Sequence, residues 1–250
     1  MMQHDSVRTK RSKGELKRFA RECLLGNYPP VMTAMLAAFF LPPLLLTPFS
    51  AGLTAGFSVA GIIYILAAVI IGILGQLLTV SVLRMHMLLA QKQPAAYMDL
   101  FWTFRNRPDR FILATFLFYA ILFVPALLAG ICIYCFLPNE AAAGGIFLTC
   151  VVLVFAALEM YLICTFEMIY PFYIDHPEMT VLQGFRASRQ IMQGNKKRLF
   201  FLQLSFLGWQ LLGLCSAGVG FLWIGPYMTQ TTVNFYLDLT GGLDKKDMHI

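Results

Sequence analysis

Charged residues are scarce in this chain of 250 residues. They make up 13% of the sequence, and hydrophobic residues make up 58%, whereas an average soluble domain is about 25% charged. A soluble fold would have to bury several apolar runs of about 20 residues each inside one small domain. The composition excludes that class and predicts an integral membrane protein.

Catalytic and phosphate-binding signatures are missing as well. The sequence contains no HExxH zinc motif, no GxSxG nucleophile elbow and no glycine-rich phosphate loop. Two of the histidines, His4 and His249, lie near the ends, and His86 stands alone. Because no nucleophile and base stand together, we expect no catalytic residue, cofactor or metal ligand. An intramembrane enzyme acting on lipids is kept as a minor alternative.

A cysteine framework and a cleaved secretory signal are also lacking. Cys132 and Cys135 are one helical turn apart, but no second pair or nearby histidine completes a metal site. The cysteines are therefore interpreted as small hydrophobic residues. Since about the first 28 residues are basic and polar, we expect the first membrane span to act as the targeting signal and to stay in place.

The hydropathy pattern predicts an all-α, polytopic bundle of six transmembrane helices. They are expected at residues 31–49, 57–83, 111–137, 146–170, 199–214 and 221–237. The last two form a hairpin, because one helix of about 39 residues would be about twice as long as the hydrocarbon layer is thick. Pro42 and Pro43 should kink or break the first span, which then needs a packed neighbour at that level.

A short basic helix is predicted between Thr180 and Arg198, just before the fifth span. Thr180 and Gln183 have the spacing of a capping box, and Gly194 suits the left-handed conformation that ends a helix. Apolar positions recur at helical spacing, namely at Val181, Phe185, Ser188 and Met192. The pattern predicts an amphipathic helix that lies on something apolar with its charges in water.

This basic helix recurs along the chain. At a shift of 168 residues, Arg18, Arg21, Gly26 and Asn27 match Arg186, Arg189, Gly194 and Asn195. A looser copy follows Pro94 and places Tyr97, Leu100, Phe101 and Phe104 on one face. We therefore predict three repeats, each a basic amphipathic interfacial helix followed by a two-span hairpin.

These repeats set the predicted domain organisation. Residues 1–13 form a disordered basic tail, residues 14–239 form a single membrane domain, and residues 240–250 form a polar tail. Within the membrane domain, the repeats cover about residues 14–93, 94–176 and 177–239.

Charge placement predicts the topology. With six spans, all 19 Lys and Arg residues fall on the side that holds both termini, which the positive-inside rule assigns to the cytoplasm of a bacterial plasma membrane. The formal net charge of +6 therefore indicates lipid contact and not nucleic acid. The basic residues either bind anionic lipid headgroups or only fix the topology, and the headgroup candidates are Arg18, Arg21, Arg105, Arg107, Arg186, Arg189, Lys196 and Lys197.

Four polar residues inside predicted spans are further candidates, because such residues are costly in lipid. Gln76 and Arg84 lie eight residues apart on the second span, and Glu159 and Glu167 have the same spacing on the fourth. If these spans pack side by side, Gln76 would meet Glu159 and Arg84 would meet Glu167. The pairs could handle protons or ions in a small transporter, or could simply hold the bundle together, which is the favoured interpretation. Gln203 and Gln210 on the fifth span have the same two interpretations.

Several sequence blocks near the C-terminus carry a family resemblance. They are S-R-x-x-M-x-G-N-K at residues 188–196, L-S-F-x-G-W at 204–209 and G-x-G-x-x-W-x-x-P-Y at 218–227. With the opening ELKRFARECLLGNY, they resemble a bacterial integral-membrane family catalogued as domain of unknown function 975. The resemblance implies a multi-pass plasma-membrane protein without assigned activity.

The function expected from the sequence is therefore a general one. We expect a non-enzymatic envelope accessory or assembly factor that acts through contacts with membrane lipids, in particular anionic ones, or with a membrane-protein partner or a second copy of the chain. A small permease-like transporter that uses Glu159 is the alternative.

Overall fold

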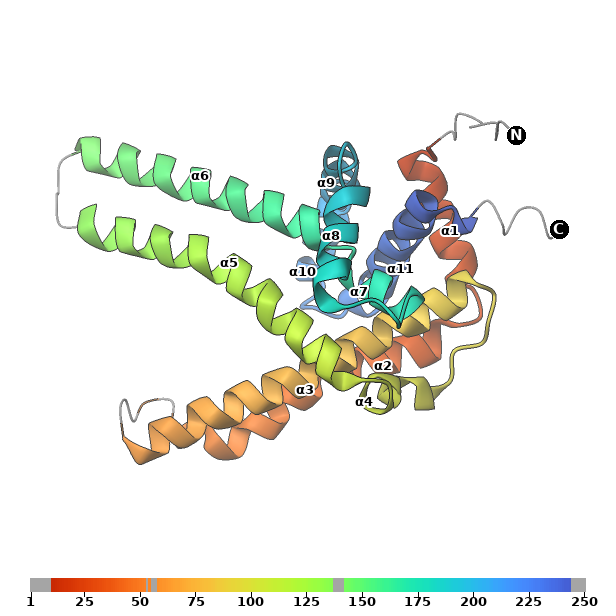
Figure 1. Cartoon of the computed structure of the whole chain (residues 1–250), viewed down its shortest axis with the longest axis horizontal. Coiled ribbons are helices and arrows are strands. Elements are labelled where there is room, and N and C mark those ends of the chain that lie inside the picture. The colour runs from red at the N-terminus through yellow and green to blue at the C-terminus, as the bar shows by residue number, and fades with distance from the viewer. Residues whose placement is uncertain (1–9, 53, 55–57, 137–141, 244–250) are drawn as a thin grey trace. The chain divides into compact units, whose positions relative to one another are not determined.

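The computed structural model describes residues 10–52, 54, 58–136 and 142–243, and these are helical with no strand among them (Figure 1). The helices are α1 (Lys13–Leu24), α2 (Tyr28–Leu46), η1 (Thr47–Gly52), α3 (Val59–Ala90), η2 (Tyr97–Phe101), α4 (Trp102–Arg105), α5 (Pro108–Phe136), α6 (Ala142–Phe166), α7 (Ile169–Asp175), α8 (Val181–Ile191), α9 (Lys196–Leu204), α10 (Leu207–Cys215) and α11 (Phe221–Thr240). They form two compact units. The first contains residues 1–108 and 201–250, and the second contains residues 109–200.

Five helical segments are long and apolar enough to cross a membrane. They are Tyr28–Ser50, Val59–Ala90, Pro108–Tyr134, Thr149–Asp175 and Lys196–Cys215, and they coincide with the first five predicted spans. Helix α11 is not among them, although it has 20 residues, because polar residues such as Gln230, Asn234 and Asp238 occupy its second half. The sixth span therefore stays a prediction.

The two prolines of the first span lie where a neighbouring helix packs closely. Helix α2 continues through Pro42 and Pro43 and runs beside α3 (Figure 1). A Cβ atom added to Gly75 of α3 would lie only 2.8 Å from Cγ of Pro42. The expected neighbour at this level is therefore present, and glycine allows the close approach.

Helix α1 packs antiparallel along the end of α11 in the first unit. The backbone N–H of Arg11 donates to Oδ1 of Asp238 at 3.3 Å, and Nδ2 of Asn234 donates to the carbonyl of Leu16 at 3.3 Å. The apolar face of α1 is buried. The apolar surface on which this basic helix lies is therefore protein.

Helix α8 has an equivalent place in the second unit, on α6 and α7. The Oγ of Ser188 donates to the carbonyl of Thr165 at 2.9 Å, and the hydroxyl of Tyr173 donates to the carbonyl of Val181. Val181, Phe185, Ser188 and Met192, which the sequence pattern places on one face of this helix, are all buried.

The middle basic segment differs from the prediction. It begins as the 3₁₀ helix η2 and continues as the four-residue helix α4. Side chains in a 3₁₀ helix repeat every three residues and not every 3.6, so the apolar face drawn from α-helical spacing is wrong. Tyr97 and Phe101 are exposed, whereas Thr103 is fully buried. The Oγ1 of Thr103 lies 2.6 Å from the Oγ of Ser81 in α3.

The three basic segments are α1, η2–α4 and α8. They share one register, in which equivalent residues have a constant spacing along the chain. Their N-cap residues, Ser12, Ala96 and Thr180, lie 84 residues apart. In each segment the side chain three residues later accepts the N–H of the cap residue, at 2.7 Å for Glu15, 2.9 Å for Asp99 and 2.8 Å for Gln183. The last of these contacts was predicted from the sequence.

The first and third segments also end alike. Gly26 and Gly194 have φ values of 80° and 75°, as predicted for Gly194. Nδ2 of Asn27 donates to the carbonyl four residues earlier at 3.4 Å, and Nδ2 of Asn195 does the same at 2.8 Å. In both cases the next residue begins the following apolar helix, α2 or α9.

The contacts of the basic segments follow a cyclic order along the chain. Helix α3, which ends the first predicted repeat, contacts the η2–α4 segment of the second. Helices α6 and α7, which end the second, contact α8 of the third. Helix α11, which ends the third, contacts α1 of the first.

Candidate functional sites

Most of the predicted headgroup residues are exposed: Arg18, Arg21, Arg105, Arg107, Arg186, Arg189 and Lys197. Arg18 is partly neutralised, since its Nε lies 3.4 Å from Oε1 of Glu22. Lys196 is half-buried, and its Nζ lies 3.6 Å from the centre of the Tyr161 ring. The cationic surface predicted from the sequence is therefore largely available to solvent or to lipid.

Arg84 has a partner that the sequence did not predict. Its Nη1 lies 2.7 Å from Oδ1 of Asp99, and its guanidinium lies 4.5 Å from the centre of the Trp102 ring. The carboxylate of Asp99 thus accepts hydrogen bonds from both the guanidinium of Arg84 and the backbone N–H of Ala96. The signal in the sequence was the position of Asp99 three residues after Ala96, the spacing that capping carboxylates favour.

The other three intramembrane candidates are half-buried. Gln76 lies in α3, Glu159 lies in α6, and Glu167 follows the end of α6. Gln76 and Arg84 belong to the first compact unit, and Glu159 and Glu167 belong to the second. The pairings of Gln76 with Glu159 and of Arg84 with Glu167 therefore stay predictions.

A buried polar cluster joins α3 to α11 and was missed by sequence reasoning. Nδ1 of His86 lies 2.9 Å from Oε1 of Gln230, and Nε2 of Gln230 donates to the carbonyl of His86 at 3.2 Å and to Oδ1 of Asn234 at 3.4 Å. All three side chains are fully buried. Because an amide oxygen only accepts, Nδ1 of His86 carries the proton, and Nε2 has no partner among the described residues.

The glutamines of the fifth span face α11. Nε2 of Gln203 donates to Oγ1 of Thr232 at 3.4 Å, and Nε2 of Gln210 lies 3.8 Å from the sulfur of Met228. These contacts favour the structural interpretation, in which polar side chains hold neighbouring helices together.

Lys17 of α1 contacts the interruption between α9 and α10. Its Nζ donates to the carbonyl of Ser205 at 3.1 Å and lies 4.0 Å from the centre of the Phe206 ring. Burial lowers the pKa of the Lys17 ammonium. This lysine therefore supplies a hydrogen-bond donor where the helix is interrupted.

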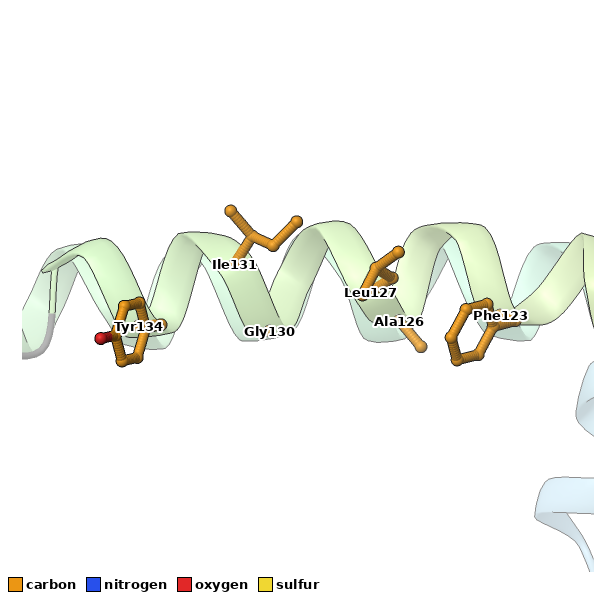
Figure 2. Close-up of a pocket in the computed structure, with 6 residues that line it drawn as sticks. All are labelled: Phe123, Ala126, Leu127, Gly130, Ile131 and Tyr134. Carbon is orange, nitrogen blue, oxygen red and sulfur yellow. The ribbon is translucent and has the colours of Figure 1, made fainter. Parts of the chain in front are cut away.

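Two hollows in the described part of the chain are lined by apolar side chains. One, of about 400 Å³, lies along α5 and is shown in Figure 2, with Phe123, Leu127, Ile131 and Tyr134 among its lining residues. The other, of about 730 Å³, lies between α2 and α11 and includes Met32, Met35, Phe39, Phe221 and Leu222. Such linings suit hydrocarbon and offer a polar solute few hydrogen bonds. No group of three or more His, Cys, Asp or Glu among the described residues could hold a metal ion.

These observations define an all-helical protein in which five helices could span a membrane. The chain belongs to the family described as "Protein of unknown function (DUF975)", whose model matches residues 2–242. The family that the sequence blocks resemble is therefore confirmed. No curated protein and no solved structure matches the chain.

Proposed function

We propose that this protein is a non-enzymatic, multi-pass protein of the bacterial plasma membrane that acts as an envelope accessory or assembly factor through lipid contacts. The observation that carries this proposal is that the two faces of the basic helices α1 and α8 have different surroundings. Their apolar faces pack on other helices of the chain, while Arg21, Arg186 and Arg189 stay exposed close to where the next apolar helix begins. A basic residue near an anionic membrane surface contributes about 1 kcal/mol of attraction.

The proposal includes six spans in three hairpin repeats with both termini in the cytoplasm. The contact between Arg11 and Asp238 supports this topology, because it keeps the two ends of the described chain together and thus favours an even number of crossings. The 84-residue spacing of the N-caps and the cyclic order of helix contacts support the three repeats. In this arrangement α11 is the sixth span, and its polar residues face α1 and α3.

Native mass spectrometry of the detergent-purified protein tests lipid contact. We expect anionic phospholipid to stay bound as collision energy rises, and fewer molecules of it to stay bound when Arg186, Arg189, Lys196 and Lys197 are all changed to Gln. A matched variant with four exposed glutamines changed to Ala, namely Gln91, Gln93, Gln190 and Gln193, should keep the lipid. A wild-type protein that retains no anionic lipid would overturn the proposal.

A small transporter is the second candidate, because Glu159 is a half-buried carboxylate within a candidate span. Our proposal predicts that the change Glu159→Gln leaves the thermal stability, the retained lipid and the ability to complement a deletion strain within error of wild type. The check is complementation of a deletion strain by the variant at matched expression. Loss of complementation with the fold and lipid intact would favour the transporter and count against our proposal.

A further inference from the structure

One arginine recurs at the same place in all three basic segments. Arg21, Arg105 and Arg189 lie 84 residues apart, and each is the basic residue in the last turn of its helix. All three are exposed, and no carboxylate of the described residues lies within 4.0 Å of them. Arg18 and Arg186 match each other, but their counterpart in the middle segment is Trp102. Among the headgroup candidates, these three arginines thus form a set with one member at the equivalent position of every basic segment.

The position of these arginines relative to the apolar helices is also shared. Helices α2, α5 and α9 begin at Tyr28, Pro108 and Lys196, within two helical turns of the respective arginine. Each of these helices contributes to a candidate membrane span. Each guanidinium therefore stands close to the end of a span, which is the level of the phosphate groups in a bilayer.

A structural role for these arginines has to be separated from a binding role. A cation in the last turn of a helix interacts favourably with the C-terminal carbonyls, and that interaction needs only the charge. A phosphate is different, because the planar guanidinium donates two parallel hydrogen bonds to it and an ammonium does not. The change from Arg to Lys keeps the first role and weakens the second.

We propose that Arg21, Arg105 and Arg189 form three equivalent sites for the phosphate group of anionic phospholipids, one in each repeat. This proposal rests on the lipid contact proposed above and specifies its number and its residues. Each site holds one headgroup through the guanidinium fork, while the acyl chains lie along the apolar helix that follows.

The test is native mass spectrometry of the full chain with phosphatidylglycerol added, and phosphatidylethanolamine as the zwitterionic comparison. We expect three tightly retained phosphatidylglycerol molecules on the wild type. Each single change, Arg21→Lys, Arg105→Lys or Arg189→Lys, should remove one, and the triple variant should remove all three without lowering the melting temperature. Arg18→Lys is the matched control and should retain three.

The outcomes separate this inference from the proposed function. If the wild type retains no anionic lipid, both fail. If the wild type retains lipid and the fourfold Gln variant of α8 and α9 retains less, but the three single Lys variants still retain the wild-type number, the proposed function stands and the three equivalent sites are overturned. Adducts with the mass of inorganic phosphate alone, or equal retention of phosphatidylethanolamine, also overturn the inference.

Discussion

The change Gly184→Ala is expected to destabilise the second compact unit by about 3 kcal/mol, at the upper end of the range for overpacked cores. An added Cβ would lie 2.2 Å from Cε1 of Tyr173. The ring cannot easily move away, because it is buried and its hydroxyl donates to Val181. Either α8 separates from α7 or the hydrogen bond breaks.

The buried thiol of Cys164 offers a local readout for this change. Cys164 lies in the same unit and is 5% exposed, so its rate of maleimide labelling during heating, measured by peptide mass spectrometry, reports the opening of this unit. Gly130→Ala is the matched control. Gly130 lies on α5 in the same unit with nothing within 4 Å of an added Cβ, and alanine there should stabilise the helix by up to about 1 kcal/mol. Equal labelling of Cys164 in both variants would contradict the packing described for Gly184.

The change Gln230→Leu is expected to destabilise the first compact unit by roughly 2 to 6 kcal/mol. It removes the acceptor for Nδ1 of His86 and the donor to Oδ1 of Asn234, and each buried polar group left without a partner costs about 1 to 3 kcal/mol. All three tryptophans, Trp102, Trp209 and Trp223, lie in this unit. Thermal unfolding followed by tryptophan fluorescence therefore measures the effect directly.

A second substitution distinguishes lost hydrogen bonds from lost packing. When His86 is also changed to Leu, the imidazole no longer needs a partner, and the double variant should recover much of the stability because both polar partners are replaced by apolar groups. Gln203→Leu is the control, since Gln203 makes one long contact with Thr232 and is not fully buried. A double variant no more stable than Gln230→Leu alone would show that the cluster is not held together by this hydrogen bond.

Local patterns in the sequence were sufficient for much of the fold. The capping contact at Thr180 and Gln183 and the left-handed Gly194 depend on residues within two or three turns of one another, and the structure confirms them. The first five spans were predictable because hydropathy over about 20 residues reflects a simple balance between lipid and water.

Contacts between distant residues were not predictable in the same way. The partner of His86 is Gln230, 144 residues away, and no local spacing indicates this pairing. In the middle segment, two turns of helical periodicity were too few to distinguish a 3₁₀ helix from an α-helix. A weak repeat of arginine, glycine and asparagine was visible in the sequence at a shift of 168 residues, but the capping hydrogen bonds were needed to place the middle segment and to define the 84-residue register.

The packing of α1 against α11 joins two helices that are synthesised far apart in time. The face of α1 that carries Leu16, Ala20 and Leu24 is buried in the folded protein, and α11 is its principal partner. At about 5 to 20 residues per second, roughly 10 to 40 s of translation separate the two helices. Throughout that interval the apolar face of α1 is without its partner α11, as it would be in any chain that stops early. Contact between α1 and α11 thus shows that translation has passed α11, and the uncovered apolar face of α1 is a surface by which chaperones and proteases can recognise a copy that stopped before it.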